Sequence, residues 1–567
     1  MPSTEVERRE GRGRCLIADK DFGVGDLIMA VQPLSAVLSE DQARVRCASC
    51  FEIIRGSGGG SRCSGCKKIW YCSRKCQQAD WGEHRPECKA WTSQASGRAP
   101  TRTLRLAGRI LNSMNRPDDS KDGGKDNGND NHSASKVREA VEELVHHNDE
   151  RSPEQMEQFR LMAAFVARLC VAGSGGKSKA LSWPSAHGRS FPGLVEAVFV
   201  VLGKVSCNVF SIVAGEFGGE ELGCGLYLEA AAANHSCHPN ASQSFDGKTL
   251  SLRCTRPIPR GEEITIAITQ IQRPGPTRRE SLRTSYFFDC RCERCESPGG
   301  RAEDARLEAY ACPDRKCPGI CLPSQKGSHA SGGHSGNTSG SKREVDGSLH
   351  PPLHHHCVTK SIENEEEEEE EERSLSLSSL HSPLSEALVG VGAYDEGAAS
   401  CLVCCTCGLT CRREEEARRH SKGVQELLQQ GKALEERGEA LAARQCLEQA
   451  VGRAEAWLHR GNWVLSELYS HLASIFVQLQ DFNAATKYAS EGLDSSRLCL
   501  SSLTPYFEPW GTSLAFTGKL LLCVQQQPEK AVPILLEAES SIKVTHGQEH
   551  PLYREVRGLL DQVDGRR

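Results

Sequence analysis

The feature that most constrains this chain is a dense array of cysteine and histidine residues between positions 47 and 88. The potential metal ligands are Cys47, Cys50, Cys63, Cys66, Cys72, Cys76, His84 and Cys88. Eight such ligands fill two tetrahedral zinc sites, which leaves no coordination position for a reactive water. Closed sites of this kind are structural, because metal binding replaces a hydrophobic core too small to fold alone. The sequence therefore predicts a zinc-stapled module over residues 47–88.

Two further groups of cysteines have the composition of metal sites. The first group, which we expect to bind a third zinc ion through four thiolates, is Cys237, Cys290, Cys292 and Cys295. The second group, a candidate for a fourth ion, is Cys312, Cys317, Cys404 and Cys407. Its ligand choice is open, because other cysteines lie nearby: Cys321, Cys401, Cys405 and Cys411. Free thiols are the alternative for this second group.

Cysteine usage and charge restrict the setting in which this chain works. The 28 cysteines often occur as Cys-x-x-Cys pairs, and residues 1–7 lack the apolar stretch of a secretory signal. Both features favour reduced thiolates on metal, and hence the cytoplasm and/or nucleus.

The net charge is −6, but residues 365–372 are eight consecutive glutamates, without which the net charge would be +2. No global basic field therefore supports direct nucleic-acid binding.

The hydrophobic pattern changes several times along the chain. Residues 11–35 and 207–268 read as short strands, and Asp246-Gly247 indicates a hairpin turn. Residues 101–114 and 137–170 have helical spacing. The most apolar run, 195–213, is interrupted by polar residues, so we expect a buried core segment and not a membrane span.

The C-terminal part is helical, and two segments lack the pattern of a folded core. From residue 412 onward, small and apolar residues such as Leu441 and Ala450 recur at helical spacing. They fall in units of roughly 34–47 residues, typical of stacked tetratricopeptide-like hairpins. Residues 116–135 and 323–400 are poor in apolar residues, so we expect solvated insertions there.

Two motifs resemble those of a known family. Residues 234–240 read Asn-His-Ser-Cys-His-Pro-Asn, and Gly261-Glu262-Glu263-Ile264 follows them. Together with Gly11-Arg12-Gly13, this pattern resembles the SET domain of lysine methyltransferases. The array at 47–88, with Trp70-Tyr71-Cys72-Ser73 inside it, resembles the MYND finger. With residues 225–227 and 545–552 added, the resemblance to the SET–MYND subfamily covers nearly the whole chain except the two insertions.

The resemblance implies an α+β multidomain fold in which a split SET β-core is interrupted by the finger and a helical insert. A cysteine-rich post-SET segment and an α-helical, tetratricopeptide-like C-terminal domain follow. The expected parts are a SET N-terminal part (1–46), the MYND finger (47–88), a helical insert (89–205) with a disordered loop at 116–135, the SET core (206–289), the post-SET zinc segment (290–322), the low-complexity insertion (323–400), a cysteine-rich segment (401–411) and the helical domain (412–567).

The resemblance also implies which residues bind which ligand. In the finger, the two ligand sets would interleave as Cys47, Cys50, Cys72 and Cys76 on one ion, and Cys63, Cys66, His84 and Cys88 on the other. S-adenosylmethionine would contact Arg12, Gly13, His147, Asn234, His235 and Phe288. For His147 the alternative is an ordinary residue on a surface helix. The third zinc site would tie the cofactor turn to the chain that closes the substrate channel.

Methyl transfer to lysine requires an uncharged amine, because the nitrogen lone pair attacks the methyl group. A narrow apolar channel favours that form by desolvation and aligns the reacting atoms. In the family pattern, Tyr286 orients the amine and Phe210 forms a channel wall. A second tyrosine is expected where this chain has Ile268, which cannot donate a hydrogen bond. Loss of that hydroxyl would cost about 1–3 kcal/mol of transition-state stabilisation, or about 10- to 100-fold in rate.

Two functions therefore stay open. The first is a protein-lysine N-methyltransferase that uses S-adenosylmethionine to modify lysines of histone or non-histone proteins. The second is a catalytically weak scaffold that binds protein partners through the finger and the helical repeats. The family's fingers commonly bind proline-rich peptides, and a purely architectural role is the alternative here. We expect a monomer without a membrane partner.

Overall fold

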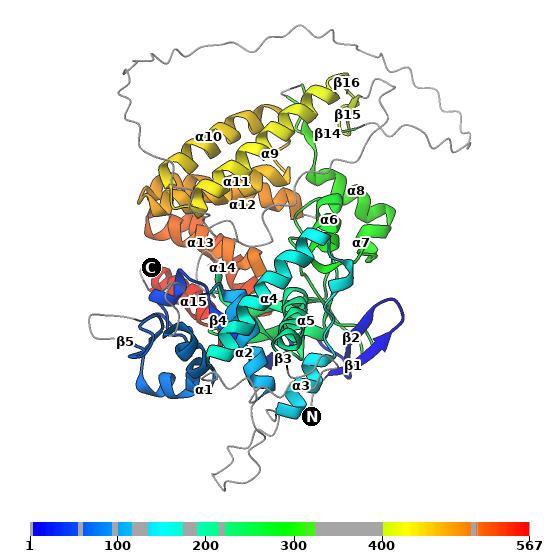
Figure 1. The fold of residues 1–567 in the computed structure, drawn as a ribbon. Helices are drawn as coiled ribbons and strands as arrows, with labels where there is room; N and C mark the ends of the chain where they lie inside the picture. Colours follow the sequence, from blue (N-terminus) through cyan, green and yellow to red (C-terminus); the bar gives the residue numbers. More distant parts are fainter. Residues whose placement is uncertain are drawn as a thin grey trace, which may run out of the picture.

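The computed structural model describes residues 4–54, 60–92, 100–115, 134–173, 190–214, 221–314, 316–323, 401–500, 506, 508–524 and 526–565. The two predicted insertions lie almost entirely outside these ranges. Of residues 116–135 only 134 and 135 are described, and of residues 323–400 only 323 is described. The described part mixes helices and strands, with a helical C-terminal region (Figure 1).

Small sheets form the β-core. Its strands are β1 (Thr4–Arg9), β2 (Gly13–Ala18), β3 (Leu27–Val31), β4 (Ser35–Leu38), β7 (Val209–Val213), β8 (Glu221–Leu226), β9 (Asn234–His235), β10 (Ala241–Asp246), β11 (Thr249–Cys254) and β12 (Thr265–Ile266). The sheets have the orders β1-β2, β10-β11-β3, β4-β8-β7 and β12-β9. Only the β12-β9 pair is parallel among these described strands. Strands before residue 47 thus pair with strands after residue 208, so the β-core is interrupted by the segment between them.

Local sequence explains the β10–β11 hairpin. Asp246 pairs with Thr249 across the turn, and Gly247 has φ +56°. A two-residue turn between antiparallel strands needs positive φ, which glycine adopts without steric cost. The predicted Asp-Gly hairpin is therefore confirmed.

The interrupting segment folds into the cysteine-rich module and a group of helices. Its elements are η1 (Gln42–Arg44), β5 (Ser61–Arg62), β6 (Trp70–Tyr71), α1 (Arg74–Thr92), α2 (Arg102–Met114), α3 (Ala134–Glu142), η3 (Asn148–Glu150), α4 (Pro153–Gly173) and α5 (Phe191–Asn208). Helices α2, α4 and α5 share one hydrophobic core with β8. Among the described helices, α5 has the length and composition to cross a membrane, yet 61% of its apolar window is buried inside the fold. That burial agrees with the core segment predicted at 195–213.

A short connecting region leads from the β-core to the C-terminal helices. It contains α6 (Gly275–Tyr286), α7 (Glu293–Glu296), α8 (Pro298–Leu307), β13 (Tyr310–Ala311), β14 (Ile320–Pro323), β15 (Leu402–Cys404) and β16 (Thr410–Cys411), whereas the short helix η5 (Ala230–Ala232) lies within the β-core, between β8 and β9. The last four strands form one antiparallel sheet in the order β13-β14-β15-β16.

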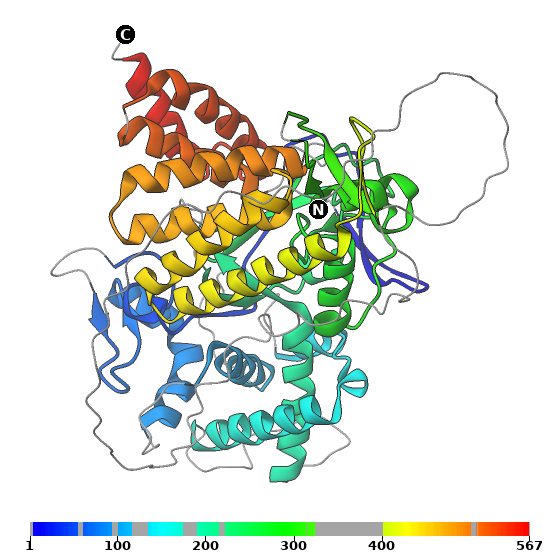
Figure 2. The same cartoon turned by 90° about the horizontal axis from the view of Figure 1, so that it is seen from above.

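Antiparallel helix pairs build the C-terminal region. The helices are α9 (Glu414–Glu436), α10 (Ala440–Trp457), α11 (Trp463–Gln478), α12 (Phe482–Leu500), α13 (Glu508–Cys523), α14 (Pro528–Thr545) and α15 (Pro551–Asp564). Figures 1 and 2 show them stacked in chain order, and α13 and α14 contact β10 and β11 of the β-core. There Arg253 donates to the carbonyl of His546 (3.1 Å) and His550 donates to that of Phe245 (2.9 Å). Leu441 lies on a helix, as its spacing predicted, but it is 64% exposed, because the buried stripe of α10 runs through Ala443, Leu447 and Ala450.

A buried arginine joins the cysteine-rich module to the β-core. Arg109, on α2, donates to the carboxylates of Asp80 (3.0 Å), Glu83 (3.3 Å) and Glu87 (2.8 Å) on α1. It also donates to the carbonyl of Ala36 on β4 (3.2 Å). The carboxylates offset the cost of burying the guanidinium. One side chain thus holds three elements in a fixed arrangement.

We predict that Arg109→Met lowers the free energy of unfolding by about 3–5 kcal/mol, because buried carboxylates lose their counter-charge. Urea denaturation followed by circular dichroism measures this change. The matched control is Arg102→Met on the same helix, whose pair with Glu221 is solvent-accessible; its cost should stay below about 1 kcal/mol. Equal costs for the two variants would contradict the role given to Arg109.

A second charge cluster links the β-core side to the C-terminal helices. Arg273 and Lys432 both pair with Glu467 on α11. His471 Nδ1 lies 2.7 Å from Glu435. Burial opposes protonation of His471, but hydrogen bonds to Glu435 and Glu467 prevail and raise its pKa to about 8. The protonated histidine therefore completes this cluster.

The raised pKa of His471 makes stability depend on pH. Its stabilisation is fully present below the unfolded-state pKa of about 6.5 and is lost as pH rises through about 8. We predict a loss of up to about 2 kcal/mol over this window, measured by urea denaturation at several pH values. His471→Gln should flatten the pH dependence between pH 6 and 9. A parent-like slope in that variant would assign the dependence to another group.

Candidate active site and metal centres

The eight predicted ligands of residues 47–88 converge into two groups of four. Cys47, Cys50, Cys72 and Cys76 form one, and Cys63, Cys66, His84 and Cys88 form the other. Within each group the ligand atoms all lie within 4.8 Å of one another. These are the interleaved sets that the resemblance implied. All-thiolate or thiolate–imidazole tetrahedra are the donor sets that structural zinc prefers.

The second of these groups is supported by a buried carboxylate. His84 offers Nε2 toward the Cys66 sulfur (3.5 Å), and its Nδ1 lies 3.3 Å from Glu87. Such a carboxylate fixes the ring orientation of a metal-bound histidine. Burial opposes ionisation of Glu87, but the charges of Arg109 and Arg105 hold its pKa well below the usual range. The metal group is therefore linked to the buried arginine described above.

A third group joins the turn after β9 to the segment after α6. It consists of Cys237, Cys290, Cys292 and Cys295, again with sulfur atoms within 4.8 Å of one another. The Cys237 sulfur lies 3.6 Å from that of Cys295 and 4.0 Å from that of Cys290. The four cysteines predicted from the sequence thus converge, and a metal held here would lock residues 290–295 against the turn at 237.

Sequence reasoning missed three charged residues around this third group. Arg278 is fully buried and donates from Nε to the Cys237 sulfur (3.1 Å). It also makes a two-point pair with Asp304 (2.8 and 2.9 Å). Arg294 reaches the same carboxylate (2.8 Å) and the carbonyl of Cys237 (3.2 Å). Four thiolates around a divalent ion carry excess negative charge, which the two guanidinium groups offset. The sequence signal for this charge-balancing role is the position of Arg294 between Cys292 and Cys295.

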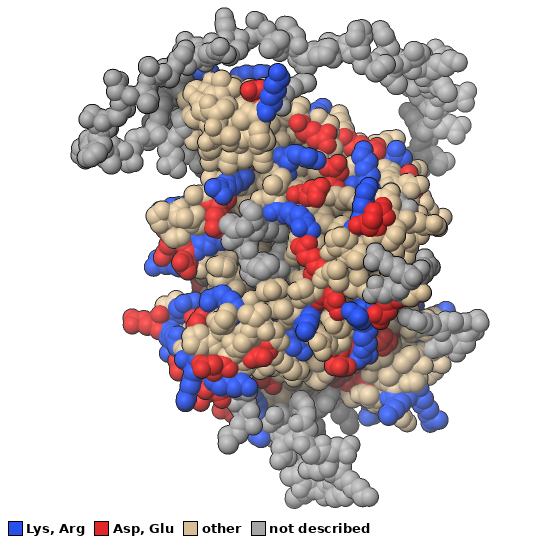
Figure 3. All heavy atoms as spheres, turned by 180° about the vertical axis from the view of Figure 1, so that it is seen from behind, with Lys and Arg blue, Asp and Glu red and all other residues tan. Residues whose placement is uncertain are grey.

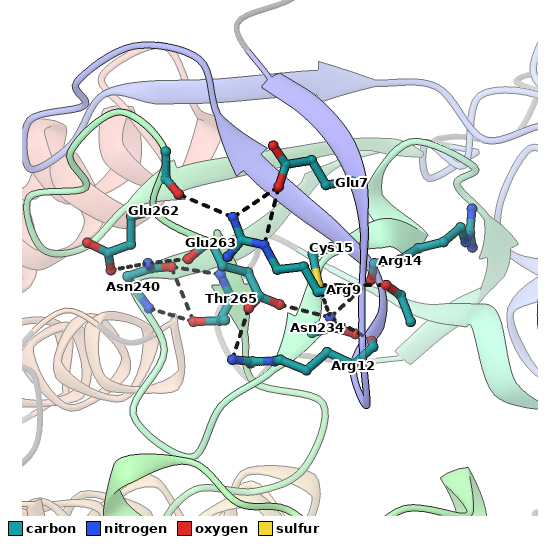
Figure 4. A network of polar contacts seen from close by, with 12 residues as sticks. Glu7, Arg9, Arg12, Arg14, Cys15, Asn234, Asn240, Glu262, Glu263 and Thr265 are labelled. Carbon is teal, nitrogen blue, oxygen red and sulfur yellow. Dashed lines mark hydrogen bonds and ion pairs between the residues drawn. The ribbon is translucent and has the colours of Figure 1, made fainter.

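The turn around Asn234 brings together three distant segments (Figure 4). Asn234 Nδ2 is within hydrogen-bond distance of the carbonyls of Arg14 (3.0 Å) and Arg12 (3.3 Å) and of Glu263 Oε1 (2.8 Å). Arg12 pairs with the buried carboxylate of Glu263 (3.0 Å). Asn240 donates to the Glu263 carbonyl (2.8 Å). The two asparagines of the motif thus hold the β1–β2 turn and the Glu262–Glu263 segment in place.

Gly11 and Gly13 shape the β1–β2 turn beside Asn234. Both have positive φ, of +70° and +68°, a backbone conformation that favours glycine. A Cβ atom on either residue would meet no atom within 4 Å. The backbone of this turn is therefore open on the sides where a ligand would approach.

His235 has its side chain in a single tautomer. Its Nδ1 accepts a hydrogen bond from the backbone N–H of Ile268 (3.0 Å). The proton therefore resides on Nε2, which faces the Cys237 sulfur at 3.3 Å. The ring of Phe288 lies 6.3 Å away, centroid to centroid. With its ring committed to protein partners, His235 would offer a ligand its backbone, as the family pattern implies.

His147 lies between α3 and α4, directly before the short helix η3, so it is not part of an α-helix, and its contact with the cofactor stays a prediction. Its backbone is left-handed (φ +47°), and its ring stacks on Phe287 at 5.6 Å. The guanidinium group of Arg151 lies over the ring of Phe287 (4.9 Å to the ring centroid) and over that of Phe159 (4.0 Å). The helical insert therefore touches the segment that carries Tyr286 and Phe288.

The two predicted channel residues have different surroundings. Phe210, on β7, packs edge-on against Tyr227 at 5.6 Å, and the Tyr227 hydroxyl donates to the carbonyl of Lys248 (2.7 Å). Tyr286 is the last residue of α6. Burial, together with the nearby Cys207, raises the pKa of Tyr286, so its hydroxyl stays protonated and able to donate at neutral pH. Ile268 packs against the β-core and supplies no hydroxyl.

Comparison with known proteins shows which family these features resemble. The family model of the MYND finger matches residues 47–88. Histone-lysine N-methyltransferase ASHR1 of Arabidopsis thaliana is 31% identical over 323 residues, which cover 56% of this chain and 61% of that protein. The chain is related to the SET and MYND domain lysine methyltransferases. N-lysine methyltransferase SMYD2-A of Danio rerio is 30% identical over 308 residues, covering 54% of this chain and 63% of that protein. For SMYD2 of Homo sapiens the values are 30% over 286 residues, 50% and 58%. The chain spans about three fifths of the length of these relatives.

We predict that Cys290→Ser removes one metal ion and lowers the thermal midpoint, because a three-thiolate set no longer closes the tetrahedron. Inductively coupled plasma mass spectrometry and thermal unfolding measure the two effects. Cys523→Ser, at an exposed cysteine outside the metal groups, is the control and should leave both unchanged. An unchanged metal content in Cys290→Ser would show that the third group binds no metal.

Proposed function

We propose that this chain is a protein-lysine N-methyltransferase with a split SET core, which transfers a methyl group from S-adenosylmethionine. The observation that carries the proposal is the convergence at Asn234: residues 12–14, 234–240 and 263 meet there, beside the metal group that holds residues 290–295. The methyltransferase relatives support the same conclusion.

The residues around Asn234 fit the proposed cofactor. S-adenosylmethionine, when bound, supplies a methyl group on a positively charged sulfur. Asn234 uses its amide nitrogen on protein partners, so its amide oxygen would be the acceptor for the cofactor's amino group. Arg12 and the open backbone of Gly13 would lie along the same ligand. We assign His235, His147 and Phe288 to the remaining contacts, because each lies against this turn or the 286–288 segment.

The substrate would be a lysine presented by another protein. Phe210 and Tyr286 would enclose its aliphatic stem, and burial in such a channel lowers the lysine pKa and favours the reactive neutral amine. The protonated Tyr286 hydroxyl would orient that amine. The MYND finger is a protein-interaction module, and we propose that it takes proline-rich peptides, with Trp81 as an exposed aromatic (41%) on α1. We further propose a monomer that acts in the cytoplasm and/or nucleus.

The catalytically weak scaffold is kept as a second candidate because of one observation. Ile268 offers its backbone N–H to His235 and its side chain to the β-core. A tyrosine hydroxyl is therefore absent at this described position, where the family pattern has one. In the scaffold function, the finger and the helical pairs would bind partners without turnover.

We predict that the purified chain transfers labelled methyl groups from S-adenosylmethionine to lysines in a protein library, as identified by mass spectrometry. Tyr286→Phe should lower kcat by about 10- to 100-fold, because the amine loses its orienting hydroxyl. Cofactor affinity measured by calorimetry should change little in this variant, whereas Asn234→Ala should weaken it.

The Ile268→Tyr variant separates the two candidate functions. A rise in kcat of about 10- to 100-fold would show that the missing hydroxyl limits an active enzyme. Cofactor binding without transfer in both the parent and Ile268→Tyr would favour the scaffold. If the parent and Asn234→Ala bind the cofactor equally, the assigned cofactor site is wrong.

A further inference from the structure

A fourth cluster of thiols lies away from the candidate active site. The sulfur atoms of Cys312, Cys317, Cys404 and Cys407 all lie within 4.8 Å of one another. Two of these residues precede the segment 324–400 and two follow it. We propose that a structural zinc ion binds these four thiolates and holds the C-terminal helices to the chain that leaves the third metal group.

The turn at Cys404 repeats the backbone geometry of both metal-binding turns in the finger. In each turn the carbonyl of the first cysteine accepts a hydrogen bond from the residue after the second cysteine. The donors and distances are Phe51 to Cys47 (2.9 Å), Lys67 to Cys63 (2.9 Å) and Gly408 to Cys404 (3.0 Å). All three donors are left-handed, with φ of +67°, +56° and +71°.

A second hydrogen bond is also common to the three turns. The backbone N–H of the first cysteine donates to a residue further along, with the same length of 2.9 Å in Cys47 to Glu52, Cys63 to Ile69 and Cys404 to Leu409. Turns that combine right- and left-handed residues direct successive N–H groups toward one point, which stabilises bound anions such as thiolates. The Cys404 turn is thus built like two turns that belong to the MYND finger.

The sulfur–sulfur distances match a metal-centred tetrahedron. Cys312 lies 3.7 Å from Cys407, and Cys317 lies 3.8 Å from Cys404, sulfur to sulfur. Both distances are far beyond a disulfide bond of about 2.0 Å. A tetrahedron with zinc–sulfur bonds of about 2.3 Å has edges of about 3.8 Å. In the finger the corresponding distance between Cys63 and Cys88 is 3.7 Å.

The residues around these four cysteines are closely packed on one side and exposed on the other. A Cβ atom on Gly319 would lie 2.7 Å from the Cys404 sulfur, so only glycine permits the close approach of the two segments. Cys321 is fully buried in the core shared with the C-terminal helices. Cys405 is exposed, although it belongs to the same turn.

The proposed ion lies where the connecting region meets the helices. In the sheet β13-β14-β15-β16, the first two strands precede the segment 324–400 and the last two follow it. Cys321 on β14 pairs with Cys404 on β15. Leu402 packs into the same core as Val424 and Leu428 of α9. The carbonyl of Ala309 accepts hydrogen bonds from the backbone of His459 and the side chain of Asn462, both at 3.1 Å.

The third and fourth groups therefore lie at the two ends of one short connection in the chain. Asp304, which pairs with the arginines around the third group, lies on α8. Helix α8 leads directly into β13 and Cys312. A metal at each end fixes this short connection, and with it the place of the C-terminal helices relative to residues 290–295. Loss of the fourth ion would release the helices without disturbing the third group.

Metal content of the full-length chain tests the proposed ion. Inductively coupled plasma mass spectrometry should find four zinc ions per chain, and three in the double variant Cys404→Ser/Cys407→Ser. The matched control is Cys405→Ser, from the same turn, which should keep four. Three ions in the parent, four in the double variant, or iron in place of zinc would overturn the proposal. Native mass spectrometry of the parent gives the same count should the double variant not fold.

Hydrogen–deuterium exchange tests the role of the ion. In the double variant, exchange should rise in β15, β16 and the first turns of α9, and stay at the parent level in β9 and α6. Addition of a chelator that removes one zinc ion from the parent should give the same pattern. Unchanged exchange in α9 after loss of the fourth ion would overturn its proposed role in holding the helices.

Discussion

Convergence of thiolates from distant parts of the chain is the constraint on which the structure depends. The β-core consists of sheets of two or three strands, which are too small to hold one another by hydrogen bonds alone. The third cysteine group joins residue 237 to residues 290–295, and two groups replace a hydrophobic core in the finger. In each case metal binding would supply free energy that apolar burial in so small a unit does not.

Buried ion pairs complement these metal groups. Arg109 with Glu87 lies behind His84, and Arg278 with Asp304 lies behind Cys237. A buried guanidinium without its carboxylate would be costly, so each pair confines its elements to one arrangement. The finger is thereby fixed to β4, and α8 to the turn after β9. On the face drawn in Figure 3, Lys and Arg side chains alternate with Asp and Glu side chains among the described residues, and no broad field of one sign is seen there.

The two asparagines of the 234–240 motif hold neighbouring segments of the candidate active site in place through protein contacts alone. Asn240 holds the Glu263–Thr265 segment, and Asn234 holds the β1–β2 turn. The contacts of Asn234 with the β1–β2 turn join residues more than two hundred positions apart in the chain. A cofactor would therefore meet a turn already ordered by protein contacts, which reduces the entropy lost on binding.

The sequence by itself predicted the ligand residues of the finger, the Asp246-Gly247 hairpin and the helical character of the C-terminal region, because spacing and turn chemistry are local properties. The division of the finger's ligands into two sets came from the family resemblance, and the ligands of the fourth group stayed open until the structure brought four of the cysteines together. The burial of side chains and their contacts with residues far away in the sequence were decided only by the tertiary structure. Leu441 has the expected helical spacing, yet the packing of α9 against α10 leaves it exposed. His147 has no local signal for its stack on Phe287, and Arg278 becomes a partner of Cys237 only when the fold buries both. Burial and long-range electrostatics arise from the whole packed chain, and no short window of sequence contains them.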